Sequence, residues 1–173
     1  MVKKFFLFLM LPLLLVGCGE QPVLEMVNDE QVQSVAAPMH QMLVDLPKEA
    51  AAPTMETETG KLYICDSFTV SQQTLSGGDL AKTVKSISGF ERDELKIMQT
   101  NWENAKRYDF VWTAAGEGET QVCRACILDD GNYHYVLTAT ADASNGGQLQ
   151  LVWREMFDSF RLVSPEMPLD TGS

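Results

Sequence analysis

Three stretches rich in β-branched and aromatic residues, separated by two short glycine-containing turns, constrain the fold of this chain more than any other feature. They are RYDFVWTAA (107–115), TQVCRACIL (120–128) and YHYVLTATAD (133–142), and the turns between them are GEGE and DDGN. Such stretches are typical of strands, and Asp-Gly and Asn tolerate the positive φ of hairpin turns. Consecutive strands joined in this way predict an antiparallel sheet.

Two helices and several further strands are expected around these hairpins. One helix is expected after Ser76 and Asp79, which resemble a capping box, and Gly89 is a good stop for it. The second helix carries an apolar stripe at helical spacing, namely Leu149, Val152, Trp153, Met156, Phe157 and Phe160. Shorter elements are expected at 39–46, 62–65, 67–75 and 95–102 (strands), 91–95 (one helical turn) and 159–163 (an edge strand). The fold class predicted is α+β, with a single antiparallel β-sheet and two helices packed on it.

The first residues have the composition of a targeting segment. Lys3 and Lys4 precede an apolar run from Phe5 to Val16, which is too short to span a bilayer. The run ends in LVGC, with the cysteine at position 18. This pattern resembles the lipobox of bacterial lipoproteins, so a signal peptide is expected at 1–17. Lipidation is expected at Cys18, with the mature protein anchored to the outer face of a membrane.

The segment that follows predicts a tether. Between residues 19 and 60 there are eight acidic residues, one lysine and no Phe, Trp or Tyr. Such a composition buries too little apolar surface to offset the entropy of ordering. We therefore expect a flexible acidic tether at 18–37, an α+β domain at 38–165 and a C-terminal tail at 166–173.

The order of these elements resembles the PsbP-like fold, which includes the extrinsic photosystem II subunit PsbP and DcrB-like bacterial lipoproteins. The resemblance rests on element order over about residues 39–163, on YHYVLTATAD and on FDSFRL at the end of the last helix. The Pro-x-x-Trp pattern common at the start of such domains is represented in LVDLPKEA by its proline alone. The resemblance implies a non-enzymatic accessory or binding domain, and it carries over no catalytic residue.

Cys123-Arg-Ala-Cys126 has the spacing of a redox motif but lies in an expected strand. A redox Cys-x-x-Cys sits at a helix N-terminus, where the helix dipole lowers the thiol pKa. Residues three apart on a strand point to opposite faces, with Cα atoms roughly 10 Å apart, too far for a disulfide. We expect Cys65, Cys123 and Cys126 to be core residues. Two alternatives stay open: a disulfide from Cys65 to one of the pair across the sheet, which leaves one cysteine free, and a reactive thiol site.

Metal and catalytic sites find little support. Structural zinc needs four ligands, and the candidates beyond the two central cysteines are Cys65, His134 and the distant His40. DDGN (129–132) lacks the spacing of a calcium loop. His134 alternates with its neighbouring tyrosines and is expected to be a cross-strand partner. The aromatic residues Tyr108, Phe110, Trp112, Tyr133 and Tyr135 are expected in the core, although they could line a pocket. We predict no cofactor, no metal and no enzymatic activity.

The net charge and the expected lipid anchor limit the classes of partner that this protein could bind. The 173 residues carry a net charge of −11, which disfavours nucleic acid and anionic lipid headgroups as partners. The main hypothesis is a lipid-anchored, non-enzymatic binding or accessory domain of the cell envelope with an unknown protein partner. The alternatives are an extracytoplasmic thiol protein that uses Cys123 or Cys126, and a carrier with a small-ligand pocket between sheet and helix.

Overall fold

A computed structural model describes residues 37–116 and 118–164. The chain divides into two units, Met1–Val35 and Ala36–Ser173, and every described residue belongs to the second. The expected signal peptide, Cys18, the tether up to residue 36 and the tail at 166–173 lie outside the described residues. None of the described helices is both long and apolar enough to cross a membrane.

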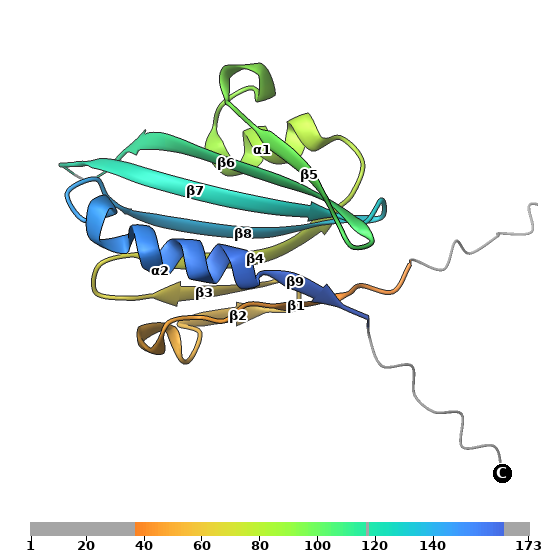
Figure 1. Ribbon diagram of the computed structural model, residues 1–173, viewed down its shortest axis with the longest axis horizontal. Helices are drawn as coiled ribbons and strands as arrows, with labels where there is room; N and C mark the ends of the chain where they lie inside the picture. The colour runs from red at the N-terminus through yellow and green to blue at the C-terminus, as the bar shows by residue number, and fades with distance from the viewer. Residues whose placement is uncertain (1–36, 117, 165–173) are drawn as a thin grey trace, which may run out of the picture. The chain divides into compact units, whose positions relative to one another are not determined.

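Seven antiparallel strands form the main sheet, in the order β2-β3-β4-β8-β7-β6-β5 (Figure 1). The strands are β2 (Met55–Thr57), β3 (Gly60–Ile64), β4 (Thr69–Ser76), β5 (Met98–Trp102), β6 (Ala105–Ala115), β7 (Thr120–Asp129) and β8 (Tyr133–Asp142). The three long central strands β6, β7 and β8 are the hairpins expected from the alternating stretches, and their bounds agree within about two residues. The α+β class with a mostly antiparallel sheet is confirmed.

The expectation of a single sheet is wrong, because a second sheet of two strands is present. In it β1 (Gln41–Leu43) pairs with β9 (Arg161–Val163), Met42 lying opposite Leu162. Both residues pack against the hydrophobic cluster under the last helix. β9 directly follows that helix, so it stays in the helix layer and meets β1 there instead of extending the main sheet. The expected edge strand at 159–163 therefore belongs to this smaller sheet.

Helices cover the two faces of the main sheet. α2 (Gly146–Ser159) lies on one face and buries Leu149, Trp153, Met156 and Phe157, as the apolar stripe predicted. α1 (Leu80–Ser88) belongs to the other face, where Val84 is fully buried. Short 3-10 turns occur at η1 (Lys48–Ala50) and η2 (Arg92–Glu94), the second where one helical turn was expected.

The ends of α1 show which signals in the sequence were correct. The side chain of Asp79 accepts a hydrogen bond from the Ala81 N–H, so Asp79 is the N-cap. Ser76 is the last residue of β4, and the expected capping box from Ser76 to Asp79 is therefore wrong. Gly89 ends the helix in the left-handed conformation with φ 79°, as predicted.

Two hydrophobic clusters, one on each face, form the core. The alternation of β7 assigns Cys126 and Leu128 to the cluster under α2, and Cys123 and Ile127 to the cluster under α1. The expectation that Cys123 and Cys126 face opposite sides is confirmed. The aromatic set is divided in the same way: Tyr108, Phe110 and Trp112 lie on the α1 side, and Tyr133 and Tyr135 on the α2 side.

Candidate functional site

An apolar groove of about 790 Å³ opens between α2 and the strands β6 and β7. Its floor includes Val111 and Thr113 of β6 with Val122 of β7, and Met98 at the start of β5 closes one side. Gly146 and Gly147, at the start of α2, form part of the opposite wall. Val111 and Met98 are 62% and 61% exposed, although both are large apolar side chains. A pocket of this size with an apolar lining and few polar groups is the usual form of a binding site.

A cluster of charged side chains lies at and beneath the floor of this groove. Arg107, 5% exposed, donates two hydrogen bonds to the Asp109 carboxylate, at 2.7 and 3.1 Å, and a third to the Phe157 carbonyl. Arg124 lies 3.5 Å from the same carboxylate and stacks over the Phe157 ring at 4.3 Å. One carboxylate thus serves two guanidinium groups, and the cluster keeps a positive charge inside a strongly acidic protein.

The pKa of Arg107 reflects this pairing. Burial lowers the pKa of the guanidinium, but the hydrogen bond to Asp109 and nearby negative charge outweigh it and leave the pKa raised. Arg107 is therefore always charged. Its role is to hold Asp109 and the end of α2 in place, which leaves Arg124 as the guanidinium that lines the groove.

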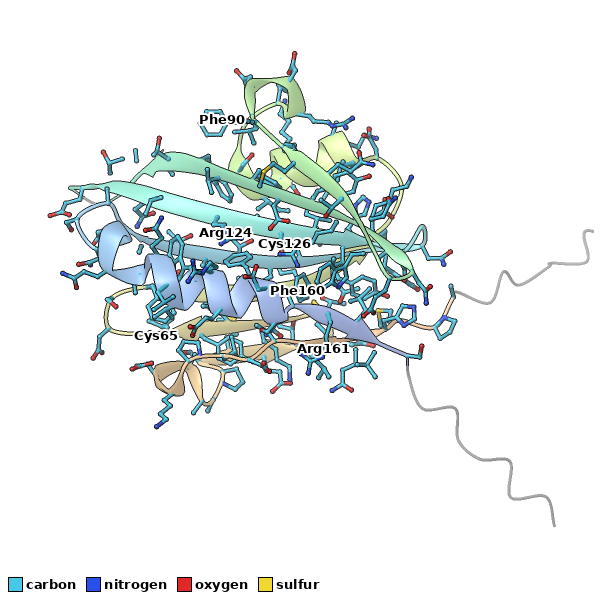
Figure 2. The ribbon with its side chains drawn as sticks, in the orientation of Figure 1. Cys65, Phe90, Arg124, Cys126, Phe160 and Arg161 are labelled. Atoms are coloured by element: carbon cyan, nitrogen blue, oxygen red, sulfur yellow. The ribbon has the colours of Figure 1, made fainter. Side chains whose placement is uncertain are left out.

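The three described cysteines are free thiols and do not form a joint site. Cys126 and Arg124 come from β7, and Cys65 comes from the turn between β3 and β4 (Figure 2). Burial raises the pKa of Cys126 well above its ordinary value, and the Asp109 charge adds to the effect. Burial also raises the pKa of Cys123, against a hydrogen bond with Thr140, and that of Cys65, where Glu49 and Asp66 contribute. Raised pKa values leave little reactive thiolate at neutral pH.

The DDGN stretch forms a hairpin turn, as expected. Asp129 accepts a hydrogen bond from the Gly131 N–H, and Asp130 accepts from the N–H groups of Asn132 and Tyr133. Gly131 has φ 93°, a conformation that glycine adopts without strain. The carboxylate oxygens that a metal would need are therefore engaged by the turn itself. Within 37–116 and 118–164, no group of three or more His, Cys, Asp or Glu side chains could hold a metal ion.

Asp130 also joins the turn to the N-terminal strand. The hydroxyl of Tyr135 donates to Asp130 at 3.0 Å and accepts from the His40 N–H at 2.8 Å. The His40 Nε2 lies 3.6 Å from the same carboxylate. Burial raises the pKa of Tyr135 to about 12. These contacts join the His40 backbone to β8 and to the DDGN turn, so we assign the group to holding the chain entry against the sheet.

His134 is fully buried and its partner is a helix residue. Its Nδ1 lies 2.7 Å from the Thr83 hydroxyl of α1. The cross-strand neighbour Asp129 lies 3.9 Å from Nε2, so the expected cross-strand partnership is the weaker of the two contacts. Thr83 was not singled out from the sequence. The one feature of the sequence that could have indicated it is that Thr83 is a polar residue next to Val84, on the apolar side of the expected helix.

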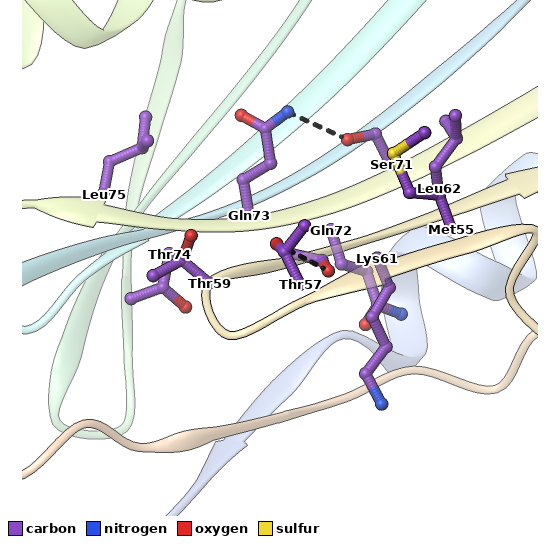
Figure 3. Close-up of a pocket in the computed structure, with 11 residues that line it drawn as sticks. Met55, Thr57, Thr59, Lys61, Leu62, Ser71, Gln72, Gln73, Thr74 and Leu75 are labelled. Carbon is purple, nitrogen blue, oxygen red and sulfur yellow. Dashed lines mark hydrogen bonds between the residues drawn. The ribbon is translucent and has the colours of Figure 1, made fainter.

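A second pocket, of about 300 Å³, lies over β2, β3 and β4 (Figure 3). Two of its polar side chains already donate local hydrogen bonds. Gln73 donates to the Ser71 hydroxyl and Thr57 donates to the Gly60 carbonyl, both at 3.2 Å. This pocket offers no charged cluster comparable to Arg107, Asp109 and Arg124, so the groove beside α2 is the candidate site.

Comparison with known proteins shows that this chain is similar to solved structures in its fold. No protein-family model and no curated protein matches the chain. A crystal structure from Bacteroides thetaiotaomicron is similar with a TM-score of 0.51 at 12% identity, and the match covers 73% of this chain and 46% of that one. This chain thus spans less than half of that protein.

Two further solved structures have lower TM-scores. LpqN, involved in cell envelope biogenesis of Mycobacterium tuberculosis, has a TM-score of 0.49 at 10% identity, covering 74% of this chain and 86% of LpqN. The PsbP protein of the cyanobacterium Synechocystis has a TM-score of 0.47 at 9% identity, covering 70% and 82%. The solved structures similar to this chain thus include a PsbP. At identities this low, the likeness concerns the fold alone.

Proposed function

We propose that this protein is a lipid-anchored, extracytoplasmic binding domain of the bacterial cell envelope, without catalytic activity of its own. The groove beside α2 is its binding site. The single observation that carries the proposal is that groove, in which two large apolar side chains stay exposed beside a surplus of positive charge. The anchor rests on the lipobox at Cys18, and replacing Cys18 with serine is expected to release the protein from the membrane fraction.

The side chains that could perform chemistry support a binding role. The described cysteines have raised pKa values, His134 is buried against Thr83, and the Asp129 and Asp130 carboxylates hold a turn. Each group is therefore used by the fold. A binding domain needs only a shaped apolar surface from which a partner can displace water, and the groove provides one.

Photocrosslinking from the anchored full chain tests this function. A photoreactive side chain would replace either Val111, in the groove, or Ile64, which is similarly exposed at 58% and lies on β3. We expect a discrete adduct from position 111 in intact cells, and its loss when Met98→Glu places a charge in the groove. Equal adducts from both positions, or an adduct that Met98→Glu leaves unchanged, would show that the groove is not the binding site.

A carrier of a small apolar ligand is the second candidate, because the groove volume lies within the range of small-molecule sites. Native mass spectrometry of the protein purified from its host distinguishes the two. A carrier would retain a bound mass that Val111→Glu removes. A protein-binding domain would show the mass of the bare chain and would still yield the adduct from position 111.

A further inference from the structure

The groove lies beside the part of β6 that has no strand paired with it on the β5 side. β5 pairs with β6 only from Trp102 opposite Ala105 to Met98 opposite Asp109. β6 continues for six more residues, 110–115, and is paired there with β7 alone. Among the described residues, no backbone hydrogen bond joins this half of β6 to a segment on its other side. We call residues 110–115 the free half of β6.

The register of β5 against β6 determines which backbone N–H and C=O groups of the free half have no partner. A two-residue turn, in which Glu103 has φ 50°, joins β5 to β6 and makes Trp102 and Ala105 a hydrogen-bonded pair. Backbone N–H groups alternate sides along a strand, so those of the odd-numbered residues of β6 face the β5 side. In the free half, Val111 and Thr113 therefore have N–H and C=O groups with no strand opposite them, while Phe110 and Trp112 bond to β7.

The free half lacks the features that protect other sheet edges. β2, at the opposite edge of the sheet, has three residues, carries Glu56 in an ion pair with Lys61 and follows Pro53. Short length, charge and proline are the usual guards against strand addition. The free half, FVWTAA, has neither a charged residue nor a proline. It is therefore open to strand addition in a way that β2 is not.

The groove lies where the side chains of an added strand would go. Val111 and Thr113 point to the α2 face and line the groove, with Met98 at the place where β5 stops. A strand beside the free half would direct alternate side chains into the same space. The charged residues that line the groove are Lys96, Asp109 and Arg124. Because Arg107 already holds Asp109, an acidic side chain in that strand would meet a surplus of positive charge.

We propose that an extended segment of a partner protein adds as a strand to the free half of β6, with apolar side chains in the groove and one acidic side chain at Arg124. This is strand addition, in which backbone hydrogen bonds supply affinity and alternate side chains supply specificity. It rests on the proposed function and names the chemistry of the partner. A second copy of this chain fits poorly, because a net charge of −11 opposes self-association and two copies would bring the same positive cluster to one interface.

A pair of synthetic peptides tests the proposal on the chain that begins at residue 19, which lacks the expected anchor and keeps every described residue. The probe is the acetylated amide of Val-Thr-Glu-Thr-Val, and the control has lysine in place of glutamate. Amide NMR shifts of the protein report binding and its place. We expect the glutamate peptide to shift Val111 and Thr113 and to slow the hydrogen exchange of their N–H groups. The overall charge of the protein would favour the lysine peptide, so a preference for glutamate shows local recognition.

Variants of one position separate the backbone from the side chain. Val111→Pro removes an N–H group that faces the open side, and proline is tolerated at such positions. Val111→Ala keeps the N–H group. We expect the glutamate peptide to bind the proline variant roughly tenfold more weakly than the alanine variant, as the loss of one hydrogen bond implies. The N–H group of Thr113 faces the same open side, so Thr113→Pro replaces Val111→Pro if that variant fails to fold. Arg124→Gln is expected to abolish the preference for glutamate over lysine.

Three results would overturn the proposal: equal binding of both peptides, shifts confined to another part of the sheet, or no binding at all. Dimers of the chain in sedimentation experiments, with Val111 and Thr113 protected before any peptide is added, would assign the free half to a second copy instead. If the peptides fail while the crosslinked adduct from position 111 persists, the binding function stands and only the strand-addition mode is lost.

Discussion

At the scale of single residues, Thr83 determines whether a fully buried histidine is hydrogen-bonded. Its hydroxyl lies 2.7 Å from His134 Nδ1, and His134 Nε2 has no hydrogen-bond partner among the described residues. Burying a polar group without a partner costs more free energy than a typical hydrogen bond contributes. The contact between α1 and β8 therefore depends on this one hydroxyl more than on any other polar group of the helix.

Replacing Thr83 with valine keeps the shape of the side chain and removes the hydroxyl. We expect the free energy of unfolding to fall by about 1–3 kcal/mol, because His134 is then left buried without a partner. Thr83→Ser keeps the hydroxyl and is expected to cost less. Urea denaturation of the two variants measures the difference. A valine variant as stable as the parent chain would contradict this account, and a loss in Thr83→Ser equal to that in Thr83→Val would show that the methyl group contributes as much as the hydrogen bond.

The cysteines allow a second test at this scale. Cys126 is fully buried and Cys123 nearly so, and burial raises the pKa of both thiols. We therefore expect neither to react with an alkylating reagent in the folded protein at pH 8, whereas half-buried Cys65 reacts slowly. All three should react after unfolding. Mass spectrometry counts the adducts, and rapid alkylation of Cys123 or Cys126 in the native state would revive the thiol alternative.

At the scale of elements, two glycines at helix ends have opposite roles. Gly89 ends α1 with φ 79°, whereas Gly147, in the first turn of α2, has no positive φ and nothing within 4 Å of an added Cβ. The first position needs a residue that tolerates the left-handed region. At Gly147, which lines the groove, there is space for a larger side chain.

Alanine at each position tests this contrast. We expect Gly89→Ala to lower the free energy of unfolding by about 1 kcal/mol, because alanine is strained at a positive φ. Gly147→Ala should leave stability unchanged or raise it by up to about 1 kcal/mol, since alanine favours the helix. Thermal unfolding measures both. A loss of stability in Gly147→Ala would mean that the start of α2 packs more closely than the structure shows.

Elements with strong local patterns could be predicted from the sequence, and elements that depend on tertiary placement could not. The three hairpin strands and α2 have alternation or an apolar stripe over many residues. β2 has three residues, MET, with exposed side chains, so no pattern distinguished it from a loop. The groove has no sequence signature, because it exists only where β5 stops short of β6 beside α2. Arg107 and Asp109 looked like ordinary polar positions of a half-exposed strand.

At the scale of the whole molecule, several ionisable groups are held protonated by the fold. The thiols of Cys65, Cys123 and Cys126 have raised pKa values, and that of Tyr135 is raised to about 12. In the unfolded chain these groups release protons at their ordinary pKa values, near 9 for thiols and 10 for tyrosine. Above those values the folded state binds more protons than the unfolded state, so stability falls as pH rises.

The prediction is that the free energy of unfolding stays level up to about pH 8 and declines between about pH 9 and 12. Urea titrations at a series of pH values measure it. Cys126→Ala should show a shallower decline than the parent chain, because one of the raised thiol pKa values is gone. A stability that is constant from pH 8 to 11 would contradict the burial of these groups.

The proposed binding site requires that the main sheet be open beside the groove, and amide hydrogen exchange on the isolated chain measures this residue by residue. Within the free half, the N–H groups of Phe110 and Trp112 bond to β7 and those of Val111 and Thr113 face the open side. We predict slow exchange for the first pair and exchange at least about tenfold faster for the second, because a hydrogen bond protects only the former. Equal protection of all four amides would mean that another segment already covers this edge, and the groove would not be a free binding site.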